Sequence, residues 1–262
     1  LTLSDVQVDP AFGHFTHNSN GSWTFTPAAN VNADQVPFRL TVTGGAQPIS
    51  STLQLAITPG NDAPILAAQT QAVAEDGTQL TGRMVATDID AGDTQTFSIA
   101  QAVDGFTLNA DGSYSFDPSH ASYQHLSQGQ TETLTIPVTV TDSAGACSTQ
   151  NLTITLTGTN DSAKINDHGT PGQIKEDQHT AIEGNLSVSD TDSGESVFSN
   201  QEGSSLNGYG NFILTPQANG QAYWRYTANH TKLAIQQLNE GQILHDSFTV
   251  HSADGTTHTI SV

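Results

Sequence analysis

Two stretches of this chain concentrate the side chains that could hold a metal ion. Each has an Asn-Asp pair, then an acidic pair fourteen to sixteen residues after the Asn, and then an Asp-x-Asp triplet. These side chains form a set of hard oxygen donors without Cys or His, and Ca²⁺ prefers such ligands. The sequence therefore predicts calcium ligands in two sets: Asn61, Asp62, Glu75, Asp76, Asp88, Asp90 and Asp93 in the first, and Asn160, Asp161, Glu176, Asp177, Asp190, Asp192 and Glu195 in the second.

The acidic residues repeat at an almost constant interval. The distance from Glu75 to Glu176 is 101 residues, and that from Asp88 to Asp190 is 102 residues. An interval of this size predicts tandem small domains, which we place at 1–60, 61–159 and 160–262. We expect residues 1–60 to be the C-terminal part of a domain, because they contain no counterpart of the acidic pairs. Solvated loop acids are the alternative interpretation, and repetition in the same three positions favours calcium.

The composition narrows the classes of partner. The chain has 262 residues, with 26 acidic against 6 basic side chains and a formal net charge of −20. Phosphate binding needs a basic face, so we expect no nucleic-acid partner. No run approaches the roughly eighteen apolar residues of a membrane helix, so we expect no direct membrane insertion. Cys147 is the single cysteine, which leaves metal ions as the available cross-links for small domains. We expect a monomeric chain whose main partners are its own neighbouring domains.

Short alternating strands separated by Gly, Asp, Asn and Ser predict an all-β chain. About seven such strands fall within residues 61–159, which is typical of a β-sandwich. Three hairpin turns occupy the same place in successive copies, at Asn20-Gly21, Asp111-Gly112 and Asn219-Gly220. A turn that needs a positive φ, followed by an aromatic residue on the returning strand, explains this recurrence without any function.

Three segments together resemble the VCBS repeats of giant bacterial surface proteins. They are residues 111–118, which read Asp-Gly-Ser-Tyr-Ser-Phe-Asp-Pro, and the segments 138–142 and 156–161. VCBS repeats are cadherin-like domains, common in RTX-type adhesins of Gram-negative bacteria. The resemblance covers nearly the whole chain and implies tandem Ig-like/cadherin-like β-sandwich (Greek-key) domains in a linear array. It also implies a protein secreted to the bacterial cell surface that acts in cell adhesion and biofilm formation.

The cadherin-like resemblance also implies calcium at the joints between domains. It matches the linker Asn-Asp pairs, the acids Glu75 and Glu176 early in the domain that follows each linker, and the Asp-x-Asp pairs. Two features depart from the cadherin pattern. Pro59 and Gly158 stand where a further acid is usual, and no clear match exists for the acid that the upstream domain contributes. We therefore expect one or two calcium ions per joint.

A binding module is the alternative to a purely structural spacer. Residues 198–232 diverge most between the copies, so a glycan or protein ligand of the 160–262 domain would be expected there. Aromatic side chains can stack on sugar rings, although packing in the core is the commoner role. The candidate aromatic residues are Tyr209, Tyr223, Trp224 and Tyr226. An accessory domain of a glycoside hydrolase is a further alternative.

Other chemistries find little support in the sequence. The ten histidines include no metal-spaced pair with Cys, so we expect solvated histidines and no zinc. No Gly-x-Ser-x-Gly, His-Glu-x-x-His or phosphate-loop motif occurs, and no EF-hand loop is present. The most clustered acids recur in every copy, which suits a structural ion better than a single active site. The sequence therefore predicts that the chain is not an enzyme.

Overall fold

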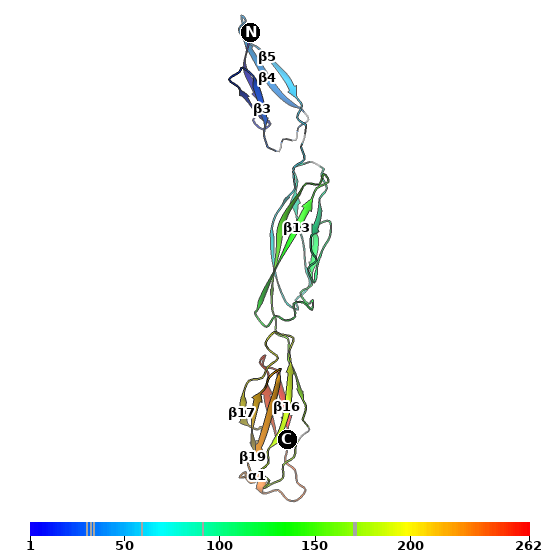
Figure 1. Ribbon diagram of the computed structural model, residues 1–262, viewed down its shortest axis with the longest axis vertical. Coiled ribbons are helices and arrows are strands. Elements are labelled where there is room, and N and C mark those ends of the chain that lie inside the picture. Colours follow the sequence, from blue (N-terminus) through cyan, green and yellow to red (C-terminus); the bar gives the residue numbers. More distant parts are fainter. Residues whose placement is uncertain (30, 32, 34, 59, 91, 170–171) are drawn as a thin grey trace.

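The computed structural model describes residues 1–262 except 30, 32, 34, 59, 91 and 170–171. Three β-rich bodies follow one another along the long axis, from the N-terminus to the C-terminus (Figure 1). We refer to them as the first domain (β1–β5), the middle domain (β6–β14) and the third domain (β15–β21). The prediction of an all-β chain of tandem sandwich domains is confirmed. No helix in the described part of the chain has the length and apolar character that crossing a membrane requires.

The middle domain consists of two sheets and one short strand pair. One sheet has the order β10-β13-β14-β7 and the other β11-β12-β8, while β6 pairs with β9. The β14–β7 pairing is parallel, and the other pairings are antiparallel. The strands are β6 (Ile65–Leu66), β7 (Gln69–Ala74), β8 (Leu80–Arg83), β9 (Ala86–Thr87), β10 (Thr96–Ile99), β11 (Phe106–Leu108), β12 (Ser113–Phe116), β13 (Thr131–Thr141) and β14 (Cys147–Thr157).

Alternation of side chains along these strands builds the core of the middle domain. Ile136, Val138 and Val140 of β13 point inward, and the Thr and Pro residues between them are exposed or half-buried. Phe116 and Ile154 lie in the same buried cluster. The described residues of the middle domain form nine strands, whereas the sequence predicted about seven. The difference arises because β6 and β9 have two residues each, which are too few to show alternation.

The third domain has a five-stranded sheet of order β15-β16-β19-β18-β17 and a pair β20-β21. Trp224 lies at the centre of its separate buried cluster and packs edge-on against Phe248, with ring centroids 5.5 Å apart. The elements are β15 (Lys164–Asp167), β16 (Ile182–Ser189), β17 (Gln201–Ser204), β18 (Gly210–Pro216), β19 (Gln221–Ala228), α1 (Leu233–Gln236), β20 (Ser247–His251) and β21 (Thr257–Ser261).

The first domain repeats only part of this pattern. Its sheet β1-β4-β5 corresponds to β10-β13-β14, and its hairpin β2-β3 corresponds to β11-β12. Among the described residues of 1–58, no strand corresponds to β6, β7, β8 or β9. Only Val6 and Val36 are buried apolar side chains there. The strands are β1 (Thr2–Val8), β2 (Gly13–His17), β3 (Trp23–Pro27), β4 (Val36–Thr43) and β5 (Ile49–Leu55).

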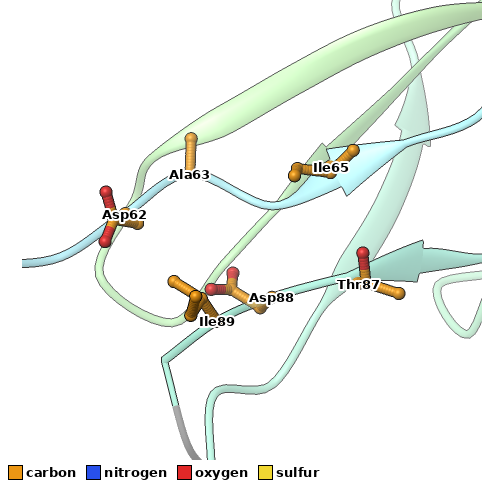
Figure 2. Close-up of a pocket in the computed structure, with 6 residues that line it drawn as sticks. All are labelled: Asp62, Ala63, Ile65, Thr87, Asp88 and Ile89. Carbon is orange, nitrogen blue, oxygen red and sulfur yellow. The ribbon is translucent and has the colours of Figure 1, made fainter. Parts of the chain in front are cut away.

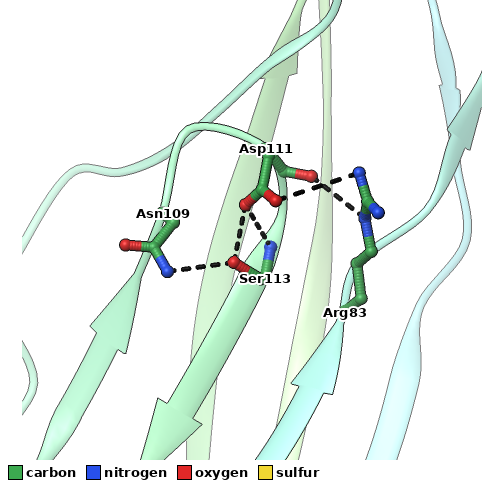
Figure 3. Close-up of polar contacts among 4 residues, drawn as sticks. All are labelled: Arg83, Asn109, Asp111 and Ser113. Atoms are coloured by element: carbon green, nitrogen blue, oxygen red, sulfur yellow. Dashed lines mark hydrogen bonds and ion pairs between the residues drawn. The ribbon is translucent and has the colours of Figure 1, made fainter.

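The hairpin turn before β12 has a local cause, shown in Figure 3. The amide and hydroxyl of Ser113 both donate to Asp111 Oδ1, over 3.0 and 2.6 Å, and Asn109 Nδ2 donates to the Ser113 hydroxyl over 2.9 Å. These hydrogen bonds from Ser113 lower the pKa of Asp111. Gly112 has a φ of +88°, a conformation that glycine adopts without strain. The recurrence of this turn follows from turn chemistry, as the sequence predicted.

The separate cores generate the first testable prediction. Phe116 is fully buried in the middle domain, so Phe116→Ala should destabilise that domain by about 3–5 kcal/mol. Trp224→Ala should act on the third domain instead, because its cluster shares no residue with that of Phe116. Scanning calorimetry should show that each substitution lowers the melting temperature of a different unfolding transition. A common shift of all transitions by both substitutions would contradict independent cores.

Candidate metal sites at the domain joints

The acidic residues of each sequence copy separate to opposite ends of a domain. After Asn61 the chain runs through β6 and β7 to Glu75, whose amide donates to the Thr157 carbonyl at the far end over 2.9 Å. It then returns through β8 and β9 to Asp88. Each extended residue advances the chain by about 3.3 Å, so residues a dozen positions apart lie at opposite ends. The prediction that Glu75 and Asp76 share a site with Asn61 is therefore wrong.

At the first joint, the carboxylates of Asp88, Asp93 and Asp142 come together. Each offers one oxygen atom, and these three atoms lie within 4.8 Å of one another. Asp142 is buried, and the other two are half-buried. One oxygen atom of Asp88 and one of Asp93, both Oδ2, are buried without a hydrogen-bond partner among the described residues. The arrangement has the oxygen chemistry that suits a divalent cation.

The linker closes over this first site. Asn61 Nδ2 donates to Asp142 Oδ2 over 2.8 Å, and the Asp62 amide donates to Asp90 Oδ2 over 2.7 Å. The Asp90 amide in turn donates to Asp88 Oδ1 over 3.0 Å. Figure 2 shows Asp62 on the linker and Asp88 after β9, beside a depression that is also lined by Ala63, Ile65, Thr87 and Ile89. The structure thus places Asn61, Asp62, Asp88, Asp90 and Asp93 at this end of the middle domain, with Asp62 held there through its backbone amide.

Asp142 is a site residue that the sequence analysis missed. Its Oδ1 accepts the amides of Ala144, Gly145 and Ala146 over 2.9, 2.6 and 2.8 Å. The Asn61 hydrogen bond is the main cause that lowers its pKa. The available signal was its place at the end of a long alternating strand, three residues before Gly145, whose φ is +97°.

At the second joint, acids from two domains meet. Glu75 of the middle domain is only 1% exposed, and its Oε2 accepts the Thr159 amide of the linker over 3.1 Å. Asp192 of the third domain is 2% exposed, and its Oδ2 accepts the Asp161 amide over 2.9 Å. The Asp192 amide donates to Asp190 Oδ1 over 3.0 Å. One carboxylate of the middle domain and one of the third domain therefore each accept a hydrogen bond from a linker amide at this joint.

The electrostatics of the second joint depend on burial and on like charges. Burial raises the pKa of Glu75, the Thr159 amide opposes this shift, and the charges of Asp192, Asp76 and Asp161 raise the pKa further. Burial likewise raises the pKa of Asp161, with contributions from Asp76, Asp192 and Asp190. These mutual effects place the acids of both domains in one negative field. A bound cation would remove the repulsion.

Several carboxylate oxygens at this joint accept no hydrogen bond from any described residue. A buried carboxylate oxygen without a hydrogen bond is unfavourable, because water no longer solvates it. Cation coordination is one arrangement that compensates for this loss. The buried oxygens without a partner among the described residues are Glu75 Oε1, Asp190 Oδ2, Asp192 Oδ1 and Glu195 Oε2.

Glu176 and Asp177 do not lie at the second joint. They occupy the turn of the third domain that is equivalent to the Glu75-Asp76 turn of the middle domain, and Asp76 (57°) and Asp177 (62°) both have a positive φ. Asp177 Oδ1 accepts a 3.4 Å hydrogen bond from Gln236 of α1, which lies at the far end of the third domain (Figure 1). The prediction that Glu176 shares a joint with Asn160 is wrong for the same geometric reason as for Glu75.

Two further positions explain departures from the predicted pattern. The cadherin pattern includes an acid from the domain before the linker, and the sequence showed no clear match for it. Glu75, which was assigned to the first joint, lies in that place at the second joint. A side chain at Gly158 would place its Cβ 2.3 Å from the Leu126 carbonyl oxygen and 2.4 Å from that of Ser127. No acid can therefore occupy position 158. Pro59, the corresponding residue of the first linker, lies outside the described residues.

The third domain holds its linker by a different acid. Asp254 Oδ2 accepts the Ala163 amide over 3.0 Å, while Ser252 and Thr256 donate their hydroxyls to the same carboxylate. Burial alone would raise the pKa of Asp254, but these hydrogen bonds outweigh it and hold the pKa well below its usual range. Ser252 stands at the strand position that Asp142 has in the middle domain. The two joints therefore have different ligand sets.

Two of the four aromatic residues proposed for ligand binding are internal, whereas Tyr209 and Tyr223 are half-buried. Trp224 is 1% exposed and Tyr226 is 3% exposed, and both belong to the core of the third domain. The Tyr226 hydroxyl donates to Asp246 Oδ2 over 2.8 Å. These two side chains cannot form a sugar-binding surface, and the expectation that Trp224 packs in the core is confirmed.

Comparisons with known proteins agree with this architecture. Residues 61–158 match the family model of the bacterial cadherin-like domain, and residues 1–58 match that of the cadherin-like domain. No curated protein sequence matches the chain.

Three solved structures are similar to this chain over 99% of its length. Protocadherin gamma B2 extracellular cadherin domains 1–5 have a TM-score of 0.57 at 18% identity, with 52% of that chain covered. Protocadherin gamma B7 extracellular cadherin domains 1–4 have 0.54 at 21% identity, with 66% covered. The protocadherin gamma B4 extracellular domain has 0.52 at 20% identity, with 43% covered. At these identities the likeness shows the fold alone, and the chain spans 43 to 66% of the length of these structures.

The raised pKa of Glu75 generates a prediction for the chain in chelator. Because the folded pKa lies above the unfolded one, the folded state binds more protons between these two values. Lowering the pH from about 7 to about 5 should therefore raise the melting temperature, and Glu75→Gln should reduce this rise. Acids whose pKa is lowered in the folded state, such as Asp142, stabilise the fold when ionised, and this contribution is lost only when the pH falls below their unfolded pKa. Exposed Glu202→Gln is the control, and an equal pH response of all three proteins would contradict the prediction.

Proposed function

We propose that the chain forms calcium-stiffened spacer domains in the stalk of a secreted bacterial surface adhesin. The match of residues 61–158 to the bacterial cadherin-like domain and of residues 1–58 to the cadherin-like domain supports this proposal. One observation carries this proposal. At the same joint, Glu75 of the middle domain and Asp192 of the third domain each bury a carboxylate oxygen that has no donor in the described part of the chain. An ion that both carboxylates bind would connect the two domains directly.

The donor set favours calcium over other divalent cations. All the candidate ligands are oxygen atoms, and Cys or His ligands, which zinc prefers, are absent from the set. Magnesium keeps its water shell and tolerates little distortion, whereas calcium accepts six to eight oxygens in flexible geometry. We assign Asn61, Asp62, Asp88, Asp90, Asp93 and Asp142 to the first joint, and Glu75, Asp76, Asp161, Asp190, Asp192 and Glu195 to the second.

Calcium would act as a mechanical link at the second joint. Without it, carboxylates from two domains repel one another across a short linker, and salt screening over about 8 Å is too weak for charges in contact. With it, the middle and third domains are held as one body. The neighbouring domains of the same chain are therefore the principal partners in this proposal. Such a stalk would stay extended outside the cell when calcium occupies its joints. Extracellular modules bind calcium with a Kd of about 10⁻⁴–10⁻³ M.

The two joints should respond differently to calcium. The described contacts at the first site all lie within residues 61–146, so an ion there would chiefly stabilise the end of the middle domain. The second site draws on both sides of its linker. Stiffening between domains should therefore be stronger at the second joint than at the first.

Calcium binding gives the first direct test. Titration calorimetry should detect calcium binding to the chain and much weaker magnesium binding. At a calcium concentration a hundred times the Kd, one site should stabilise the folded chain by about 2.7 kcal/mol. Asp192→Asn should weaken binding, whereas Glu202→Gln should leave it unchanged. Identical melting curves in calcium and in chelator would overturn the proposed function.

Small-angle scattering tests the mechanical part of the proposal. The double variant Asp190→Asn/Asp192→Asn should lose the effect of calcium on the distribution of distances between the middle and third domains. The matched variant Asp88→Asn/Asp93→Asn should retain it, because those residues contact no residue of the third domain in the described structure. A maximum dimension that is equal with calcium, with chelator and in both variants would exclude a calcium-dependent hinge.

A further inference from the structure

Two direct hydrogen bonds cross the second joint at Ser193. The Ser193 amide donates to the His125 carbonyl over 3.0 Å, and the Ser127 hydroxyl donates to the Ser193 carbonyl over 3.0 Å. Ser193 belongs to the third domain, whereas His125 and Ser127 belong to the loop between β12 and β13 of the middle domain. Both backbone polar groups of Ser193 are therefore satisfied by the neighbouring domain.

The position of Ser193 connects this contact with the acidic cluster. Ser193 directly follows Asp192 in the loop that carries Asp190 and Glu195. The Glu195 amide donates to the Asp192 carbonyl over 3.3 Å, and the Asp161 amide donates to Asp192 Oδ2, so this loop is also held internally and by the linker. Fixing the Ser193 backbone therefore fixes the direction in which the Asp192 carboxylate faces Glu75.

The loop that receives Ser193 is itself firmly held. Backbone hydrogen bonds join this loop to the start of the linker. The Gly129 amide of the loop donates to the Gly158 carbonyl over 3.0 Å, and the Gly158 amide donates to the Gln130 carbonyl over 2.7 Å. Leu126 is buried in the core of the middle domain. The next linker residue, Thr159, donates to Glu75. One loop thus supports both halves of the acidic cluster.

We infer that Ser127 is a positioning residue for calcium at the second joint. Its hydroxyl and the His125 carbonyl form a latch that docks the Asp190–Glu195 loop onto the middle domain. The latch orders the carboxylates of both domains before the ion binds, so less ordering remains to oppose binding. By linkage, calcium must strengthen the latch by the same factor by which the latch strengthens calcium binding. Among the described residues, no hydrogen bond joins 1–58 to the middle domain, so this latch distinguishes the second joint from the first.

The calcium affinity of the full chain tests this role. The background variant Asp88→Asn/Asp93→Asn removes the first site, so that calorimetry reports the second. Adding Ser127→Ala should weaken calcium binding about three- to tenfold, the factor expected for the loss of one hydrogen bond. Ser122→Ala is the matched control, because its hydroxyl bonds to Asp104 within the middle domain and not across the joint. This control should leave the affinity unchanged.

Hydrogen exchange of the Ser193 amide tests the latch without calcium. In chelator, Ser193 should exchange about three- to tenfold faster in Ser127→Ala than in the wild type or Ser122→Ala. Unchanged exchange at Ile154, in the core of the middle domain, verifies that the variant is folded. An unchanged Ser193 exchange rate, or an unchanged affinity in Ser127→Ala, would overturn the inference.

The affinity measurement rests on the proposed function, but the exchange measurement does not. If the wild-type chain binds no calcium, the proposed function fails, and the exchange rate of Ser193 alone then decides whether the latch exists. If calcium binds and Ser127→Ala behaves as Ser122→Ala does in both measurements, the latch fails and the calcium function stands. The two failures are therefore distinguishable.

Discussion

The buried carboxylate of Glu75 is the constraint around which the second joint is arranged. It is removed from water at the end of the middle domain, and the charges of Asp192, Asp76 and Asp161 lie near it. Only one of its oxygens accepts a hydrogen bond from the residues that the structure describes. Such a group is stable only with a proton or a cation, because an uncompensated buried charge is costly. The linker and the Asp-x-Asp loop of the third domain both contact this cluster. In the proposed function, the state of this one carboxyl group would influence how the two domains are held together.

The joints of this chain are built on one plan but with different parts. At the first, the clustered carboxylates of Asp88, Asp93 and Asp142 come from the middle domain, and the side-chain amide of Asn61 in the linker donates a hydrogen bond to Asp142. At the second, the cluster crosses the linker, and Ser193 adds direct contacts between domains. A row of similar sandwiches can therefore have joints of unequal stiffness. In the proposed stalk, stiff and compliant joints would decide where the chain bends under load.

Sequence reasoning recognised the right residue types but grouped them incorrectly. Glu75 and Asp88 are close in sequence, but one crossing of the domain by the extended chain, through β8 and β9, places them at opposite ends. Asp142 was missed because its partner Asn61 is 81 residues away, a separation at which no local pattern exists. Trp224 shows a related ambiguity. Its place on an alternating strand was visible in the sequence, but the choice between a surface platform and a core position depends on the sheet that packs against it.

The sequence by itself determined the elements and the kind of chemistry. Alternating side chains specify strands, Asp111-Gly112 and its counterparts specify hairpins, and acids without Cys or His specify hard oxygen donors. The tertiary structure alone decided which acids meet, that Gly158 has no room for a side chain, and that Ser127 reaches Ser193. The physical reason is that local geometry sets where a strand begins and ends, whereas the end of a sandwich is assembled from loops distant in sequence. Those loops are brought together only by the pairing and packing of whole sheets.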